Sequence, residues 1–213
     1  MKISLINGSP KTKGSASGVI LKELQELLSP KDHIVNLHFT KHRPDEGDVD
    51  LLQDCDAIVF AFPLYVDALP SHLVSCLIQL ENSFKNTAFP HNCTVYAIVN
   101  CGFYEGRQNV LALDIMKCWC EKAGVVWGGG LGIGGGGMMP VLGNIAPGKG
   151  PKKNFSHALE TLSDRISRRE SGKNICFSPN FPRFLYKIAA EIGWRQAVKN
   201  NGLKTHDLWN RQI

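Results

Sequence analysis

The chain has 213 residues, of which 43% are hydrophobic and 20% charged, so it can bury a core and is not a disordered polymer. This length suits one α/β domain, alone or with an appendage, and no apolar run reaches the roughly 20 residues that span a bilayer. The net charge of +5 is uneven: residues 1–148 hold 11 Lys and Arg against 14 Asp and Glu, a net −3, whereas residues 149–213 hold 13 against 5, a net +8.

The first two thirds of the chain alternate between predicted strands and helices. Short apolar runs, typical of strands covered on both faces, predict strands at 2–7, 57–62, 95–99 and, starting a fifth, 125–127. Ile34, Leu37 and Phe39 suggest a further strand at 34–39, although their alternation is imperfect. Apolar residues at helical spacing predict helices at 17–28, 70–84 and 111–123. This alternation predicts the α/β class, with a doubly wound, five-stranded parallel sheet.

The last third reads differently. Helices are expected at 156–169 and 181–201, with a break at 178–182 between them. We therefore predict one domain at 1–171 and a helical C-terminal extension at 172–213. Within the second helix an apolar stripe at helical spacing is typical of a packed face; it comprises Phe184, Leu185, Ile188, Ala189 and Ile192.

A glycine tract at 128–137 follows the start of the fifth strand and is expected to be neither a helix nor a good strand. Two alternatives remain for it. It is either a loop of close approach, near the functional site or at a subunit contact, or a flexible connector.

The end of the first predicted strand has the features of a phosphate site. The segment from Asn7 to Ser17 offers four hydroxyls and two lysines directly before a helix. A helix N-terminus supplies unpaired N–H groups and partial positive charge. Capping the helix needs only one hydroxyl, so four of them favour phosphate. Neither GxGxxG nor GxxxxGK[ST], the spacings of the usual nucleotide loops, fits this segment.

Two further strand ends present aromatic and aliphatic side chains. Residues 63–70 read PLYVDALP, and residues 100–106 read NCGFYEG, in which two glycines let backbone N–H groups approach a ligand. In an open parallel sheet, ligands bind beyond the carboxyl ends of the strands. A phosphate loop beside two such loops predicts FMN, although ordinary packing would explain any one of these aromatics alone.

These three segments, with GSPKTKGSAS at 8–17 as the first, resemble the flavodoxin-like NAD(P)H-dependent FMN reductase family, which includes quinone, azo and chromate reductases. The resemblance covers about residues 1–170 and implies that 1–171 is a flavodoxin-like FMN-binding domain. It also extends to the iron–sulfur flavoproteins, but their cysteine cluster is missing, since residues 38–56 contain only Cys55.

The resemblance assigns roles residue by residue. The phosphate and ribityl chain are expected to be held by Ser9, Lys11, Ser15, Ala16 and Ser17. One side of the isoalloxazine ring is expected to be lined by Pro63, Leu64, Tyr65 and Val66. Backbone donors to the ring and an aromatic cover are expected from Asn100, Cys101, Gly102, Phe103 and Tyr104.

The resulting hypothesis is an oxidoreductase that transfers a hydride from NAD(P)H through FMN to a small acceptor such as a quinone, free flavin, azo or nitro compound. The flavin carries the chemistry, so no catalytic side chain is predicted. Two alternatives remain open. One is a flavodoxin-type electron carrier, and the other is a non-catalytic redox-sensing module whose basic tail binds nucleic acid or an anionic membrane.

Partners and location follow from weaker signals. The basic residues of the tail are scattered, so we expect no nucleic-acid and no membrane partner, and the family resemblance implies a homodimer. The seven cysteines lie mostly in apolar stretches without a CxxC spacing, which indicates reduced thiols and no metal site. Without a recognisable signal peptide, we expect a cytoplasmic protein.

Overall fold

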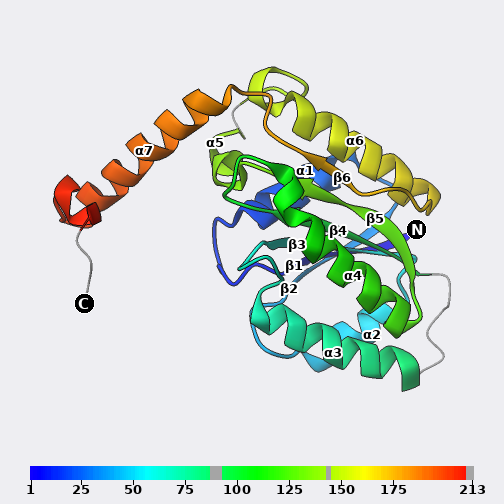
Figure 1. Ribbon diagram of the computed structural model, residues 1–213. Coiled ribbons are helices and arrows are strands. Elements are labelled where there is room, and N and C mark those ends of the chain that lie inside the picture. Colours follow the sequence, from blue (N-terminus) through cyan, green and yellow to red (C-terminus); the bar gives the residue numbers. More distant parts are fainter. Residues whose placement is uncertain (87–92, 143–144, 210–213) are drawn as a thin grey trace. The chain divides into compact units, whose positions relative to one another are not determined.

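A computed structural model of the chain describes residues 1–86, 93–142 and 145–209 (Figure 1). The chain divides into two units, residues 1–179 and 180–213. The first unit contains β1 (Lys2–Asn7), α1 (Ala16–Leu27), β2 (His33–His38), α2 (Glu46–Gln53), β3 (Ala57–Pro63), α3 (Ser71–Asn86), β4 (Thr94–Asn100), α4 (Val110–Ala123), β5 (Val126–Ile133), α5 (Met139–Leu142), α6 (Lys153–Arg168) and β6 (Ile175–Phe177). The second contains α7 (Arg183–Asn200).

The strands form a single parallel sheet in the order β2-β1-β3-β4-β5-β6. The chain passes from β1 to β2 on one side of the sheet and then crosses to the other side of β1, where β3, β4, β5 and β6 follow in order. The strand order therefore changes direction once, between β1 and β3. This arrangement confirms the predicted doubly wound α/β class. Because all strands run parallel, their carboxyl ends lie along the same edge.

Both faces of the sheet are buried, as the continuous apolar runs predicted. Along β3, Ile58, Phe60 and Phe62 face a core shared with α3 and α4. The alternate residues Ala57, Val59 and Ala61 face a second core shared with α1 and α6. The two helical layers cover opposite faces in Figure 1. Side chains that alternate between two cores explain why this strand shows no polar face.

The sheet has six strands where five were predicted. Residues Ile175–Phe177 pair with β5 in the register Leu131 to Ile175 and Ile133 to Phe177. The first unit therefore extends to Pro179, eight residues beyond the expected domain end at 171. A strand of three residues is too short to show a periodic pattern, so only its pairing with β5 reveals it.

The glycine tract forms strand β5 and the turn after it, contrary to the expectation that it would be a poor strand. Close packing requires the glycines. A Cβ on Gly128 would lie 2.2 Å from the ring of Tyr96, and one on Gly130 would lie 2.5 Å from Leu113. The β5 backbone thus lies so close to neighbouring side chains that there is no room for a Cβ at these positions.

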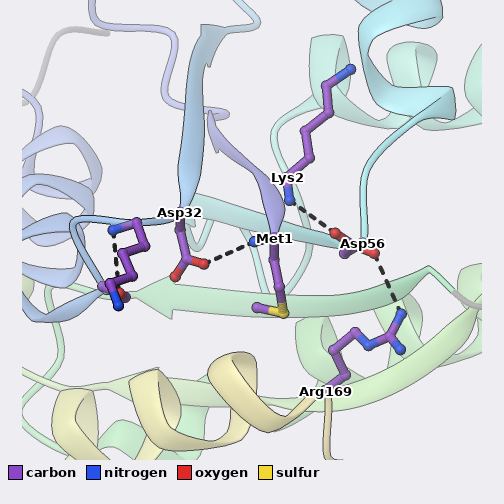
Figure 2. Close-up of polar contacts among 7 residues, drawn as sticks. Met1, Lys2, Asp32, Asp56 and Arg169 are labelled. Carbon is purple, nitrogen blue, oxygen red and sulfur yellow. Dashed lines mark hydrogen bonds and ion pairs between the residues drawn. The ribbon is translucent and has the colours of Figure 1, made fainter.

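Polar contacts hold together the opposite edge of the sheet, where the strands begin (Figure 2). The Asp56 carboxylate accepts a hydrogen bond from the Lys2 backbone N–H at 2.9 Å and faces the Arg169 guanidinium at 3.4 Å. The Met1 amino group contacts Asp32 at 3.0 Å. Asp56 therefore links the start of β1 to Arg169, the C-cap residue of α6.

The second unit is a helix followed by a short turn, and none of the residues of α7 is buried. The apolar stripe of α7 is exposed in the single chain, with 66% of Phe184 and 59% of Ile192 accessible, so its packing on another surface stays a prediction. Among the described residues, we find no helix with the length and apolarity needed to cross a membrane.

The glycine packing predicts a stability difference between two substitutions in the same tract. Gly128→Ala should lower the free energy of unfolding by about 1–3 kcal/mol, because the Tyr96 ring is fully buried and cannot move aside. The Tyr96 hydroxyl holds the ring by donating to the carbonyls of Arg165 and Glu170. Gly137→Ala is the control, since its Cβ would meet no atom within 4 Å. Urea unfolding that shows equal losses for both variants would contradict this packing.

Candidate functional site

A cleft opens at the carboxyl edge of the sheet, where β1, β3 and β4 end and α1 begins. Its cavity has a volume of about 240 Å³. It is lined by Ser9, Lys11, Ser15, Ala16, Ser17, Pro63, Leu64, Tyr65, Asn100, Cys101, Gly102, Gly136 and Gly137. Eleven of these thirteen residues were predicted as site residues from the three strand ends.

The loop after β1 is held by its own hydrogen bonds. The side chain of Asn7 accepts from the Ser9 N–H at 3.0 Å and donates to the Ser15 hydroxyl at 3.2 Å. Ser15 is the N-cap of α1, and its oxygen also accepts from the Gly18 N–H at 3.1 Å. Hydrogen bonds among its own residues therefore fix the position of this loop at the start of α1.

Three hydroxyls of this loop use their oxygens as acceptors. Besides Ser15, Ser9 accepts from the Lys11 N–H at 3.3 Å, and Ser17 accepts from the Asn100 amide at 2.9 Å. Each hydroxyl thus keeps its hydrogen to donate to a ligand in the cleft. The N–H groups of Ala16 and Ser17, at the start of α1, lack intrahelical acceptors and add donors at the same place. Such a set of donors suits an anion, which only accepts hydrogen bonds.

The loop after β3 makes a tight turn beside the cleft. Leu64 donates its N–H to the Asn100 carbonyl at 2.8 Å, which joins the ends of β3 and β4. Tyr65 and Ala68 exchange two backbone hydrogen bonds, with Val66 and Asp67 between them at φ of 48° and 59°. This left-handed backbone is strained for a β-branched residue such as Val66. Val66 points to solvent, 98% exposed, and does not line the cleft.

The loop after β4 is fixed against the end of the glycine tract. Gly135 donates its N–H to the Phe103 carbonyl at 2.6 Å, and Gly136 donates to the Cys101 carbonyl at 2.7 Å. This contact corresponds to the first alternative for the tract, a loop of close approach at the site. A Cβ on Gly102 or Gly137 would meet no atom within 4 Å, so both leave open space in the cleft wall.

Cys101 lies in the cleft wall as a thiol. Burial raises the pKa of the Cys101 thiol above its ordinary value, although hydrogen bonding with Phe103 and Asn109 offsets part of the rise. The Asn109 amide donates to the sulfur at 3.4 Å. A thiol with a raised pKa is a poor nucleophile at neutral pH, so Cys101 shapes the wall instead of reacting.

Two predicted aromatics lie outside the cleft lining. The side chain of Phe103 is 58% exposed. The Tyr104 hydroxyl donates to the Pro179 carbonyl at 3.4 Å, and this contact ties the loop after β4 to the segment after β6. Thr12, which carries the fourth hydroxyl of the loop after β1, is also exposed and outside the lining.

The structure adds two histidines beside the loop after β1 that the sequence did not single out. His38, at the end of β2, contacts the Ser9 carbonyl through Nε2 at 2.9 Å. His72, in the first turn of α3, is buried, and its Nε2 has no partner among the described residues. Burial lowers the pKa of His72, and the backbone of Phe39 and Gly8 offsets this only in part. Neither histidine belongs to a motif, so only the fold reveals them.

Within the described part of the chain, no three His, Cys, Asp or Glu side chains gather as a metal site would need. The polar groups of the cleft are hydroxyls, an amide, a lysine and backbone N–H groups. This donor set suits a phosphorylated organic ligand better than a metal ion.

Comparison with known proteins establishes the class of fold. No protein-family model and no curated protein matches this sequence. Among solved structures, the chain is similar to an NADH:FMN oxidoreductase in apo form, with 14% identity and a TM-score of 0.57 over 80% of this chain and 90% of that one. It is also similar to an NADPH-quinone reductase from P. pentosaceus, with 13% identity and a TM-score of 0.55 over 78% and 96% of the two chains.

A third similar structure is a flavodoxin, WrbA-like protein from Agrobacterium tumefaciens, with 10% identity and a TM-score of 0.52 over 79% of this chain and 98% of that one. At such identities the likeness concerns the fold. The chain thus has the flavodoxin-like α/β fold that the three sequence segments implied.

The buried His72 predicts an acid-dependent loss of stability. Because its pKa is lowered in the folded state, the unfolded chain binds more protons once the pH falls below about 6.5, the ordinary value for histidine. The free energy of unfolding should therefore decrease as the pH is lowered through this range. His72→Gln should flatten that decrease, whereas His157→Gln, at an exposed position, should not. Urea unfolding at several pH values measures the slopes, and equal slopes for all three proteins would contradict the assignment.

Proposed function

We propose that the protein is an FMN-dependent oxidoreductase that transfers a hydride from NAD(P)H by way of the flavin to a small acceptor, such as a quinone, free flavin, azo or nitro compound. The observation that carries the proposal is the loop after β1. Its three cleft-lining hydroxyls are already engaged as acceptors and keep their hydrogens for an anion. The loop opens into the same cleft as the ends of β3 and β4.

The residues at one end of the cleft fit a phosphate. Ser9, Ser15 and Ser17 supply hydroxyl donors, and the exposed Lys11 supplies a positive charge that can turn toward the ligand. Ala16 and Ser17 begin α1, whose N-terminus favours negative charge. No rearrangement of the loop is needed, so little ordering entropy opposes binding.

The other end of the cleft fits a flat ring. Pro63, Leu64 and Tyr65 form a mostly apolar wall after β3. Gly102 and Gly137 leave the opposite wall open enough for a ring to approach the backbone. Val66, Phe103 and Tyr104 do not line the cleft. We therefore propose them only as residues near the edge of the ring site and not as part of its walls.

FMN bound here would supply the two-electron chemistry, accepting a hydride and passing electrons to the second substrate. The protein's part is to hold the phosphate, to orient the ring between the two walls and to keep water from its buried side. Cys101 suits this role, because burial keeps its thiol protonated and unreactive. No side chain has to act as an acid or base.

The alternative of a flavodoxin-type carrier predicts a different reaction with the nicotinamide. Under anaerobic conditions, NADH or NADPH should bleach the absorbance of bound FMN rapidly if the protein is a reductase. A carrier would bind FMN but remain yellow with both nucleotides. Protein that is colourless as purified and binds no added FMN would refute both readings and favour a non-catalytic module.

The unpaired state of all seven cysteines supports the proposed cytoplasmic location, since disulfides are rare in that compartment.

The phosphate end can be tested with a matched pair of variants. Ser9→Ala removes one hydroxyl that faces the anion, and hydrogen bonds to charged groups contribute about 1.5–3 kcal/mol. We therefore expect FMN affinity to fall about 10- to 100-fold. Thr12→Ala removes a hydroxyl of the same loop that lies outside the cleft and should leave the affinity unchanged. Quenching of FMN fluorescence on binding measures both, and an equal loss in the two variants would contradict this placement of the phosphate.

We also propose that the protein forms a homodimer through the faces of α3 and α4. The two helices flank an apolar groove with exposed Val74 and Ile78 on one side and Leu111 and Ile115 on the other. On α4, Asp114 and Lys122 also line this groove. A two-fold axis between them would place Asp114 of each copy near Lys122 of the second copy. Asp67 and Glu81 also line the groove. This charge arrangement makes a second copy of the chain the fitting occupant.

The proposed two-fold arrangement makes a specific prediction for Cys118. It is exposed, lines the groove and lies midway between Asp114 and Lys122, so two copies of it should meet near the axis. Mild oxidation should yield a covalent dimer, and Cys118→Ser should abolish it while leaving the dimer seen by sedimentation velocity intact. Ile78→Glu should shift sedimentation toward monomer. A wild-type protein that sediments as a monomer at micromolar concentration would overturn the proposed dimer.

A further inference from the structure

The C-terminal unit, residues 180–213, combines positive charge with exposed apolar side chains. It contains six Lys and Arg against two Asp and Glu, a net +4. Its helix α7 has no buried residue. A unit of 34 residues with no core of its own gains little from folding unless another surface covers its apolar side chains.

The charged side chains of α7 are regularly spaced along the helix. Its charged residues occupy every fourth position and form one row that winds around the helix by about 40° at each step; they are Arg183, Lys187, Glu191, Arg195 and Lys199. Glu191 is paired with Arg195 at 3.7 Å, so its negative charge is compensated within the row. All the remaining positions of α7 carry uncharged side chains.

Large apolar side chains accompany this row along the whole unit. Within α7, Phe184, Ile188 and Ile192 form a neighbouring row, and Trp194 is 62% exposed. Beyond the helix, Leu203, Leu208 and Trp209 continue the exposed apolar surface, with Trp209 accessible over 79% of its area. The unit thus offers basic groups and aromatic or aliphatic groups on the same short segment.

We propose that this unit binds the surface of an anionic lipid membrane, with α7 lying in the interface and not crossing it. Lys and Arg would meet the negatively charged headgroups, while Phe, Ile and Trp side chains enter the acyl boundary beside them. Long basic side chains can bury their stems and keep their charges in water, so the two rows need not lie on opposite sides. Five charged residues within α7 keep it from spanning the bilayer.

The exposed apolar side chains favour lipid over nucleic acid as the occupant. Phosphate contacts to DNA or RNA would satisfy the basic row but leave Ile188, Ile192 and Leu203 in water. A lipid interface satisfies both rows. The proposal replaces the expectation of no membrane partner, which rested on the scattered spacing of the basic residues. It does not depend on the proposed flavin chemistry.

Co-sedimentation of the full-length chain with vesicles tests the proposal. The protein should pellet with vesicles of phosphatidylcholine and phosphatidylglycerol in equal amounts, and should remain in solution with phosphatidylcholine alone. Raising the salt should weaken the binding, because screening reduces attraction to the headgroups. Binding to neither vesicle, or equal binding to both, would overturn the proposal.

Charge variants assign the binding to α7. The triple variant Lys187→Gln, Arg195→Gln and Lys199→Gln should weaken binding to the anionic vesicles about 100-fold, since each basic residue contributes about fivefold. Glutamine retains helix propensity, and circular dichroism checks that the helix is kept. The control removes three positive charges from exposed positions of the first unit, Lys31→Gln, Lys117→Gln and Lys153→Gln. Equal losses in the two triple variants would overturn the role of α7.

Tryptophan fluorescence reports on insertion independently of charge. Two of the four tryptophans, Trp194 and Trp209, are exposed in this unit, whereas Trp119 is buried in the first. Anionic vesicles with brominated acyl chains should quench the wild-type fluorescence, and Trp194→Phe with Trp209→Phe should remove most of that quenching. Retention on a DNA column without any vesicle-dependent quenching would identify a nucleic-acid partner and overturn the proposal.

Discussion

The backbone of the glycine tract lies so close to neighbouring segments of the chain that side chains larger than hydrogen do not fit between them. The shape of the cleft depends on this close packing. A Cβ on Gly134 would lie 2.1 Å from the Tyr104 carbonyl oxygen, and one on Gly106 would lie 2.2 Å from that of Phe177. These contacts press the end of β5, the loop after β4 and the short strand β6 into one layer. The wall that contains Cys101 and Gly102 is therefore part of the rigid sheet edge and not a free loop.

A rigid wall opposite a self-bonded loop gives a cleft that is formed before a ligand arrives. Asn7 and Asn100 are the two residues that connect its parts: Asn7 bridges Ser9 and Ser15 within the loop, and Asn100 joins the end of β4 to Ser17 of α1 and to the Phe62 carbonyl of β3. The Ser15 and Ser17 hydroxyls are consequently oriented by side-chain amide donors from two strands, and the Ser9 hydroxyl by the Lys11 backbone N–H. Preorganised donors of this kind favour a charged group, because no ordering cost opposes its binding.

The basic surplus of the last third turns out to consist of two parts with different roles. Half of it, a net +4 from residues 149–179, belongs to the first unit, where Lys152 is buried against Glu23 at 2.8 Å and Arg169 faces Asp56. These cations stabilise contacts with the acidic part of the chain. The other half, in residues 180–213, belongs to a unit whose apolar side chains are exposed, and there positive charge and apolar surface are available together.

The sequence by itself determined the order of the first five strands, the parallel sheet and most of the cleft, because apolar runs identify strands buried on both faces and parallel strands end at one edge. Ser9, Ser15, Pro63 and Asn100 were predicted together for this reason. Only the tertiary structure decided the rest. Strand β6, the exclusion of Val66 and Tyr104 from the cleft, and the positions of His38 and Gly136 depend on contacts between distant segments, where packing and hydrogen bonding, and not local pattern, place each residue.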